Sequence, residues 1–147
     1  MRKIAINADY GGFCLSQEAT KMLYELQNPG KQLYAYKRVY SDRSDEPDYF
    51  IKSTVEDSSV FFTEDLGDKV DDNHVDSNLF IFEWMLVDDR HDPNLIKVIE
   101  TLGTRANGEC ADIKIVEIPD DAKYIIQEYD GCETVVTRDN VDNWNWK

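Results

Sequence analysis

The stretch from residue 92 to residue 136 constrains the fold most, because capping and turn residues mark the ends of its elements. Asp92 can cap a helix, and Pro93 fits the first helical turn, where its missing N–H costs nothing. Apolar residues then recur at the helical period as far as Gly103, which is a typical helix end. They are Leu95, Ile96, Ile99 and Leu102. The spacing predicts one amphipathic helix over residues 93–102.

Three strand-like runs follow this helix. Asn107-Gly108 is a turn signal, Pro119 ends the first run, and Asp130-Gly131 is a dipeptide typical of hairpins. The runs are residues 113–118, 124–129 and 134–136. Because they are consecutive and closely spaced, they predict a three-stranded meander.

The remaining sequence predicts one more helix and five more strands. Ser16 is a suitable N-cap, and the helix that it starts should stop at Asn28-Pro29-Gly30. The strand-like runs are residues 3–7, 33–40, 49–55, 60–63 and 80–87. We expect the third and fourth of these to form a hairpin. The last run, FIFEWMLV, is the most hydrophobic and predicts a core strand, with a short helix as the alternative.

These elements predict an α+β fold, with two helices packed on a largely antiparallel sheet of six or more strands. At 147 residues the chain fits a single domain over residues 1–147. Residues 42–92 form its acidic middle segment, and residues 138–147 form a loosely held tail.

Composition excludes several classes of protein. No apolar run approaches the ~20 residues that a membrane span needs, and the first residues lack the apolar core of a signal peptide. Cys14, Cys110 and Cys132 are an odd number without CxxC spacing, which argues against a disulfide framework or a structural zinc site. We expect a protein of the cytoplasm.

Negative charge is the strongest global feature. The formal net charge is −14, and it is unevenly distributed. Residues 1–41 carry a net +3, residues 42–92 a net −12, and residues 93–147 a net −5. Such a field repels nucleic acid and anionic membranes, so we expect direct binding to neither, and it attracts basic protein surfaces.

Two blocks of motifs lie toward the ends of the chain. The N-terminal block is INADYGGFCLSQEA, and the C-terminal block combines a helix ending in LG, an ANG turn, IKIVEIPDD and EYDG. Both blocks resemble a family of small phage and prophage proteins with no assigned activity. Together they cover about residues 4–26 and 90–136, and the acidic middle lies outside them. The resemblance implies a phage origin and a location in the host cytoplasm, and it implies no catalytic residues.

The strand–glycine–helix corner after residue 7 is a candidate ligand site. Backbone N–H groups at a helix start can hold an anion, and glycines allow a ligand to approach closely. The residues concerned are Asn7, Asp9, Tyr10, Gly11 and Gly12. Their spacing matches neither G-x-G-x-x-G nor a P-loop, so a tight structural turn is the competing interpretation.

Two further patterns hint at chemistry. Cys14 lies near a helix start, which can lower a thiol pKa, with His74 and His91 as the histidines that could pair with it; a structural cysteine is the alternative. The pattern Asp72-x-His74-x-Asp76-x-Asn78, with Glu83 at position twelve, resembles a calcium loop but has Ser77 where glycine is needed. We interpret it as a solvated acidic loop, and we expect no metal, no cofactor and no catalytic residue.

The acidic middle and the tail supply the candidate partner-binding residues. Carboxylates among aromatic residues suit a protein interface, and a solvated surface is the alternative. The carboxylates are Asp42, Asp45, Glu46, Asp48, Glu56, Asp57, Glu64, Asp65, Asp68, Asp71, Asp72 and Asp76. Trp144 and Trp146 could anchor a partner or a second copy of the chain, or dock onto their own domain.

Three functional classes remain open. The leading hypothesis is a non-enzymatic phage accessory protein that binds and inhibits a host protein with a basic surface. In the most specific version of this hypothesis, the host protein belongs to a defence system and the acidic segment imitates a nucleic-acid backbone. The second is a small-molecule binder that uses the glycine corner to sequester a nucleotide signal. The third is an enzyme that uses Cys14 or the carboxylates.

Overall fold

The computed structural model describes residues 1–138, and its contacts divide the chain into two compact units. Unit 1 combines Met1–Ala19 with the chain from Val87 onward, and unit 2 is Thr20–Leu86. Within residues 1–138 there are two helices and nine strands, and every strand pair is antiparallel, so the α+β class is confirmed. None of the described helices is both long and apolar enough to cross a membrane. The expectation of a single domain stays a prediction.

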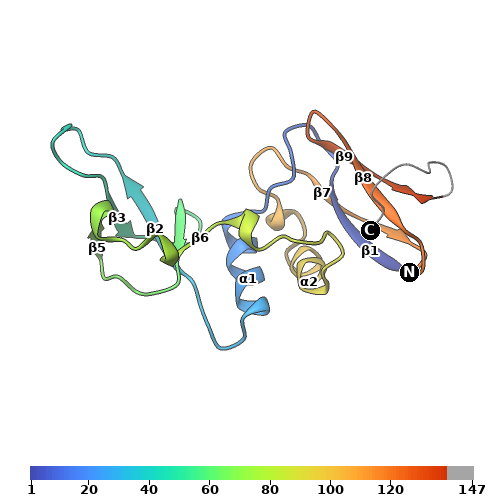
Figure 1. The fold of residues 1–147 in the computed structure, drawn as a ribbon, viewed down its shortest axis with the longest axis horizontal. Helices are drawn as coiled ribbons and strands as arrows, with labels where there is room; N and C mark the ends of the chain where they lie inside the picture. Colours follow the sequence, from blue (N-terminus) through green and yellow to red (C-terminus); the bar gives the residue numbers. More distant parts are fainter. Residues whose placement is uncertain (139–147) are drawn as a thin grey trace. The chain divides into compact units, whose positions relative to one another are not determined.

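Unit 1 contains two two-stranded sheets (Figure 1). Strand β1 (Arg2–Asn7) pairs with β7 (Ile113–Ile118), and β8 (Tyr124–Tyr129) pairs with β9 (Cys132–Thr137). The predicted meander is therefore wrong in its first pairing, because β7 pairs with β1. The two sheets share one hydrophobic cluster, whose buried members are Ile4, Ile6, Ile118 and Tyr124. Burial of these side chains favours the long-range β1–β7 pair over a local hairpin.

Helix α2 (Pro93–Leu102) forms where the sequence predicts it. The Asn94 N–H donates to Asp92 Oδ1 over 2.9 Å, which confirms the cap, and Gly103 ends the helix at a φ of 59°. The apolar face is buried at Leu95, Ile96, Val98, Ile99 and Leu102.

Helix α1 (Gln17–Gln27) starts in unit 1 and continues into unit 2. Ser16 is its N-cap as predicted, because Ser16 Oγ accepts from the Ala19 N–H over 3.1 Å. The Ser16 hydroxyl also donates to the Arg105 carbonyl over 2.6 Å, which ties the helix start to the segment after α2.

Unit 2 contains a five-stranded sheet in the order β5-β3-β2-β4-β6. The strands are β2 (Tyr34–Val39), β3 (Tyr49–Lys52), β4 (Val60–Phe62), β5 (Lys69–Asp71) and β6 (Phe80–Ile81). The expected β3–β4 hairpin is wrong, since both strands pair with β2, one on each side. The nine strands thus form three sheets where the sequence predicted one.

Aromatic side chains fill the core of unit 2. Tyr36, Phe50, Val60 and Phe62 are buried together, and the Phe62 ring lies 4.9 Å from Tyr36 and 5.1 Å from Phe50. The Tyr36 hydroxyl donates to the Gly67 carbonyl over 2.7 Å and accepts from the Leu66 N–H over 2.9 Å. These bonds satisfy the buried hydroxyl and hold the β4–β5 connection against the core.

The hydrophobic run 80–87 does not form the predicted core strand. Only Phe80 and Ile81 pair with β4, and Glu83–Met85 form a short 3₁₀ turn. Strand β4 is three residues long, so it offers few backbone partners to a longer neighbour. As a result Trp84 is 76% exposed, although the composition of the run predicts burial.

Candidate functional site

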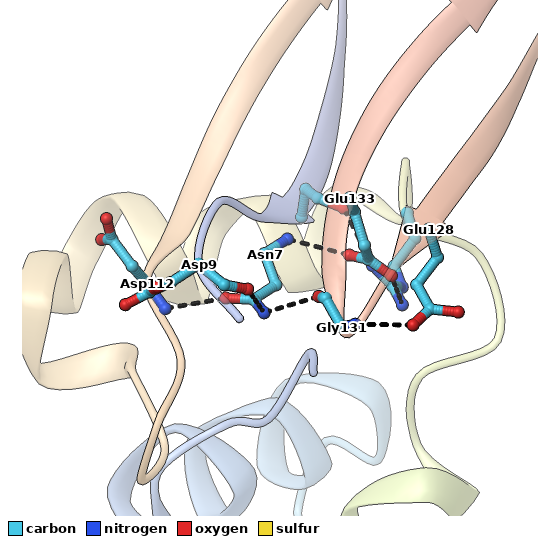
Figure 2. Close-up of polar contacts among 8 residues, drawn as sticks. Asn7, Asp9, Asp112, Glu128, Gly131 and Glu133 are labelled. Atoms are coloured by element: carbon cyan, nitrogen blue, oxygen red, sulfur yellow. Dashed lines mark hydrogen bonds and ion pairs between the residues drawn. The ribbon is translucent and has the colours of Figure 1, made fainter. Parts of the chain in front are cut away.

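Asn7, at the end of β1, joins three parts of unit 1 (Figure 2). Its side chain is fully buried, and Nδ2 donates to the carbonyls of Asp9 over 2.6 Å and Gly131 over 2.8 Å. Its Oδ1 accepts from the Asp112 N–H over 2.8 Å. The Asn7 amide group therefore binds the protein's own backbone, which is what a buried amide requires.

The glycine corner is packed against the same loops. Gly11 donates its N–H to the Asp130 carbonyl over 3.0 Å. A Cβ on Gly131 would come within 2.2 Å of the Gly12 nitrogen, and one on Gly11 within 2.8 Å of the Cys110 carbonyl oxygen. The glycines here allow backbone segments to pass close to each other, which supports the structural interpretation of the corner.

Arg90 and Glu133 form a bidentate ion pair beside this corner. Arg90 Nη1 and Nη2 donate to the two carboxylate oxygens over 2.6 and 2.9 Å, and the guanidinium lies 3.8 Å from the centre of the Phe13 ring. Glu133 is only 8% exposed, and it also accepts from the Asn7 N–H over 2.8 Å. Both charges are thus neutralised within the protein.

An open depression of about 550 Å³ lies next to Gly12 and Phe13. Its charged lining is Asp88, Arg90, Glu128 and Glu133, so acidic groups outnumber basic ones and the arginine is already paired. A phosphate group would meet net repulsion there.

The cysteine and calcium-loop patterns take other roles in the structure. His91 Nδ1 lies 2.5 Å from the Tyr124 hydroxyl. The Cys14 sulfur packs against Gly108, and a Cβ added to Gly108 would come within 2.4 Å of that sulfur. Asp76 accepts from the Asn78 N–H over 2.9 Å, which starts a 3₁₀ turn. Over residues 1–138, no group of three or more histidine, cysteine or acidic side chains is arranged to hold a metal ion.

Several of the acidic residues proposed as partner contacts have ion pairs within unit 2. Arg38 Nη1 lies 2.9 Å from Asp72 and 3.5 Å from Asp48, and Lys52 Nζ lies 2.7 Å from Asp65. Arg43 is near Asp45 and Glu46, and His74 is near Asp71. The hydrogen bond from Lys52 lowers the pKa of Asp65, and the same bond raises the pKa of Lys52. These carboxylates contribute less to an external field than their number suggests.

Five of the proposed contacts are exposed and, within the described chain, have neither an ion-pair partner nor a hydrogen bond to their carboxylate. They are Asp42, Glu56, Asp57, Glu64 and Asp68. They lie in the connections β2–β3, β3–β4 and β4–β5. Asp76 is also exposed without an ion-pair partner in the described chain, but its carboxylate accepts from the Asn78 N–H. Residues 42–86 hold thirteen acidic and three basic residues, a net charge of −10, so the unpaired carboxylates lie in a strongly negative field.

The structure separates core aromatics from exposed ones. Phe50, Phe61 and Phe62 are buried, whereas Tyr40 is 73% and Trp84 is 76% exposed. Trp144 and Trp146 lie outside the described residues.

Comparisons of the chain with protein-family models, with curated proteins and with solved structures found no match. Sequence reasoning missed the Arg90–Glu133 pair, because 43 residues separate the partners. It also predicted a core strand for the run that contains Phe82 and Trp84, whose side chains are exposed. A signal for this exposure was a glutamate within the hydrophobic run, Glu83.

Proposed function

We propose that this chain is a phage accessory protein that binds and inhibits a host protein through the acidic surface of unit 2. The observation that carries the proposal is the set of five exposed carboxylates that have neither an ion pair nor a hydrogen bond in the described chain. The resemblance of both chain ends to phage and prophage proteins supports the setting, the host cytoplasm.

The expected partner is a protein with a basic groove, such as a nucleic-acid enzyme of a host defence system. Exposed carboxylates keep most of their hydration until they bind, so a partner's lysines and arginines can pair with them at a modest desolvation cost. In this mode the acidic connections occupy the positions of nucleic-acid phosphates. Long-range attraction speeds the encounter, and added salt weakens it.

The nucleotide-binding alternative receives less support. The Asn7 amide is saturated by backbone groups, Gly11 and Gly12 pack against neighbouring loops, and the nearby depression is acidic.

A charge-matched pair of variants tests the proposal. The first neutralises the five unpaired carboxylates of unit 2 as Asp→Asn or Glu→Gln. The second neutralises five exposed acidic residues of unit 1 in the same way, which gives the same net charge. The unit 1 residues are Asp88, Glu109, Glu117, Asp121 and Asp130. Tagged proteins are used to capture partners from bacterial lysate, with washes at low and at moderate salt.

Wild type and the unit 1 variant should both retain a basic host protein at low salt and release it at moderate salt. The unit 2 variant should fail to bind that protein. Wild type should also inhibit the activity of that protein. Equal capture by all three proteins would contradict the proposal, and so would capture without inhibition.

A further inference from the structure

The rings of Phe80, Phe82 and Trp84 form a stack at the β6 edge of the unit 2 sheet. Successive ring centres are 5.8 and 6.3 Å apart, and successive ring planes differ by 6° and 7°. Phe80 and Phe82 are alternate residues of an extended segment, so their rings point to the same side, and the 3₁₀ turn Glu83–Met85 places the Trp84 ring next to Phe82. Phe80 packs 4.8 Å from Phe62 in the core, whereas Phe82 is 42% and Trp84 76% exposed. The stack thus runs from the core into solvent and ends in an open indole.

Two unpaired carboxylates lie at the same end of the β4–β6 pair. The register places Phe61 opposite Ile81 and Phe62 opposite Phe80. Because the two strands are antiparallel, the C-terminal end of β6, which leads to Trp84, lies beside the N-terminal end of β4, which begins at Val60. Glu56 and Asp57 shortly precede Val60, and both are exposed without an ion-pair partner in the described chain.

The protein's own arginines show which group suits a ring beside carboxylates. The Arg38 guanidinium lies 4.6 Å from the centre of the Phe50 ring, and its Nη1 bonds to Asp72 over 2.9 Å. Arg90 likewise lies on Phe13 and bonds to Glu133. Both planar cations combine a ring face with a carboxylate. Among the described residues, none places a cation over Trp84.

We propose that Trp84, with Glu56 and Asp57, forms a docking site for an arginine side chain of a basic partner protein. This inference rests on the proposed function and names the place where the partner is anchored. A guanidinium is planar and weakly hydrated, so it can stack on the indole while its N–H groups bond to a carboxylate. A nucleobase could also stack, but its phosphate would enter a segment with a net charge of −10.

Two labelled peptides of equal charge, deca-arginine and deca-lysine, test the site. Their affinities are measured by fluorescence anisotropy at low salt with wild type, Trp84→Ala and a Glu56→Gln/Asp57→Asn double variant. Tyr129→Ala is the matched control, because Tyr129 is an exposed aromatic residue (74%) of unit 1. Circular dichroism verifies that each variant is folded.

Trp84→Ala should weaken deca-arginine binding by about three- to thirty-fold, the range of a cation–π contact, and deca-lysine binding by less. Tyr129→Ala should change neither affinity. When Trp84→Ala is combined with Glu56→Gln/Asp57→Asn, the fold loss of deca-arginine affinity should be smaller than the product of the separate fold losses. The reason is that the indole and the carboxylates bind the same guanidinium.

Equal arginine affinity of wild type and Trp84→Ala would overturn the inference. Tighter binding of an oligothymidylate than of deca-arginine would overturn it as well, and so would a wild-type dimer that Trp84→Ala dissociates. The proposed function is tested separately by neutralising only Asp42, Glu64 and Asp68. If that variant loses affinity for both peptides while Trp84→Ala loses none, the result supports binding by the acidic surface and contradicts the arginine site. If only Trp84→Ala loses affinity, the result supports the arginine site and contradicts binding by the wider acidic surface.

Discussion

Gly131 lies so close to Gly12 that a Cβ on Gly131 would come within 2.2 Å of the Gly12 backbone nitrogen. The contact joins the β8–β9 hairpin turn to the corner that follows β1, two segments more than a hundred residues apart in sequence. Nearby, Asn7 binds the Gly131 carbonyl over 2.8 Å. The corner that resembles a ligand loop in sequence is therefore an internal contact of unit 1.

Gly131→Ala should destabilise the protein more than Gly67→Ala does. Both glycines have a φ of 87°, so both substitutions carry the left-handed backbone cost of about 1–2 kcal/mol. An added Cβ at Gly67 meets nothing within 4 Å, whereas one at Gly131 meets backbone, which adds about 1–3 kcal/mol. Urea unfolding followed by circular dichroism measures both variants. Equal losses would show that the Gly131–Gly12 approach is not close in solution.

Asn7→Asp should be strongly destabilising at neutral pH. The Asn7 side chain donates to two carbonyls, and an ionised carboxylate would face these oxygens without a donor. A buried charge without a partner costs about 3–5 kcal/mol. Asn73→Asp introduces the same charge at an exposed site and should change the free energy of unfolding little. A small effect of Asn7→Asp in denaturant titrations would contradict the buried hydrogen-bond arrangement.

Arg90→Met should destabilise unit 1 by about 3–5 kcal/mol, because it leaves the buried Glu133 carboxylate without its bidentate partner. Adding Glu133→Gln to Arg90→Met removes the uncompensated charge and should recover part of the loss. A double-mutant cycle on the free energy of unfolding measures this coupling. Strictly additive effects would show that the two side chains do not interact.

Tyr36 should make unit 2 sensitive to alkaline pH. Burial raises the pKa of the Tyr36 hydroxyl above its usual value near 10. The hydroxyl therefore ionises at a lower pH in the unfolded chain than in the folded protein, and this ionisation favours the unfolded state. The stability from the neutral hydroxyl is fully present below the pKa of the unfolded state and is lost as pH rises through the pKa of the folded state. Denaturation midpoints from pH 8 to pH 11 should fall less steeply in Tyr36→Phe than in wild type. Tyr40→Phe, at an exposed position, should follow wild type, and identical slopes for all three proteins would contradict the prediction.

Local sequence signals predicted the two helices well. The prediction of strand pairing failed where the pairing depends on residues far apart in the sequence. Asp92, Ser16 and Gly103 act within a few residues of their helices, so their roles can be read from sequence alone. The β1–β7 pairing depends on burial of distant residues such as Ile4 and Ile118, which no local pattern encodes.

The candidate site shows the same limit. The sequence supplied all twelve acidic candidates but not their pairing, because Arg38 reaches Asp72 and Lys52 reaches Asp65 only once the strands are arranged. Hydrophobicity likewise suggested that Trp84 is buried, and the short β4 strand leaves it exposed.

The salt dependence of binding tests the central claim most directly. The dissociation constant for the captured partner is measured between 50 and 300 mM NaCl for wild type, the unit 2 charge variant and the unit 1 charge variant. If the unpaired carboxylates of unit 2 bind a basic surface, affinity of wild type and the unit 1 variant should fall by about tenfold or more over this range. The unit 2 variant should bind weakly, with a much flatter dependence on salt. A salt-independent wild-type complex, or the same steep slope for the unit 2 variant, would contradict the account.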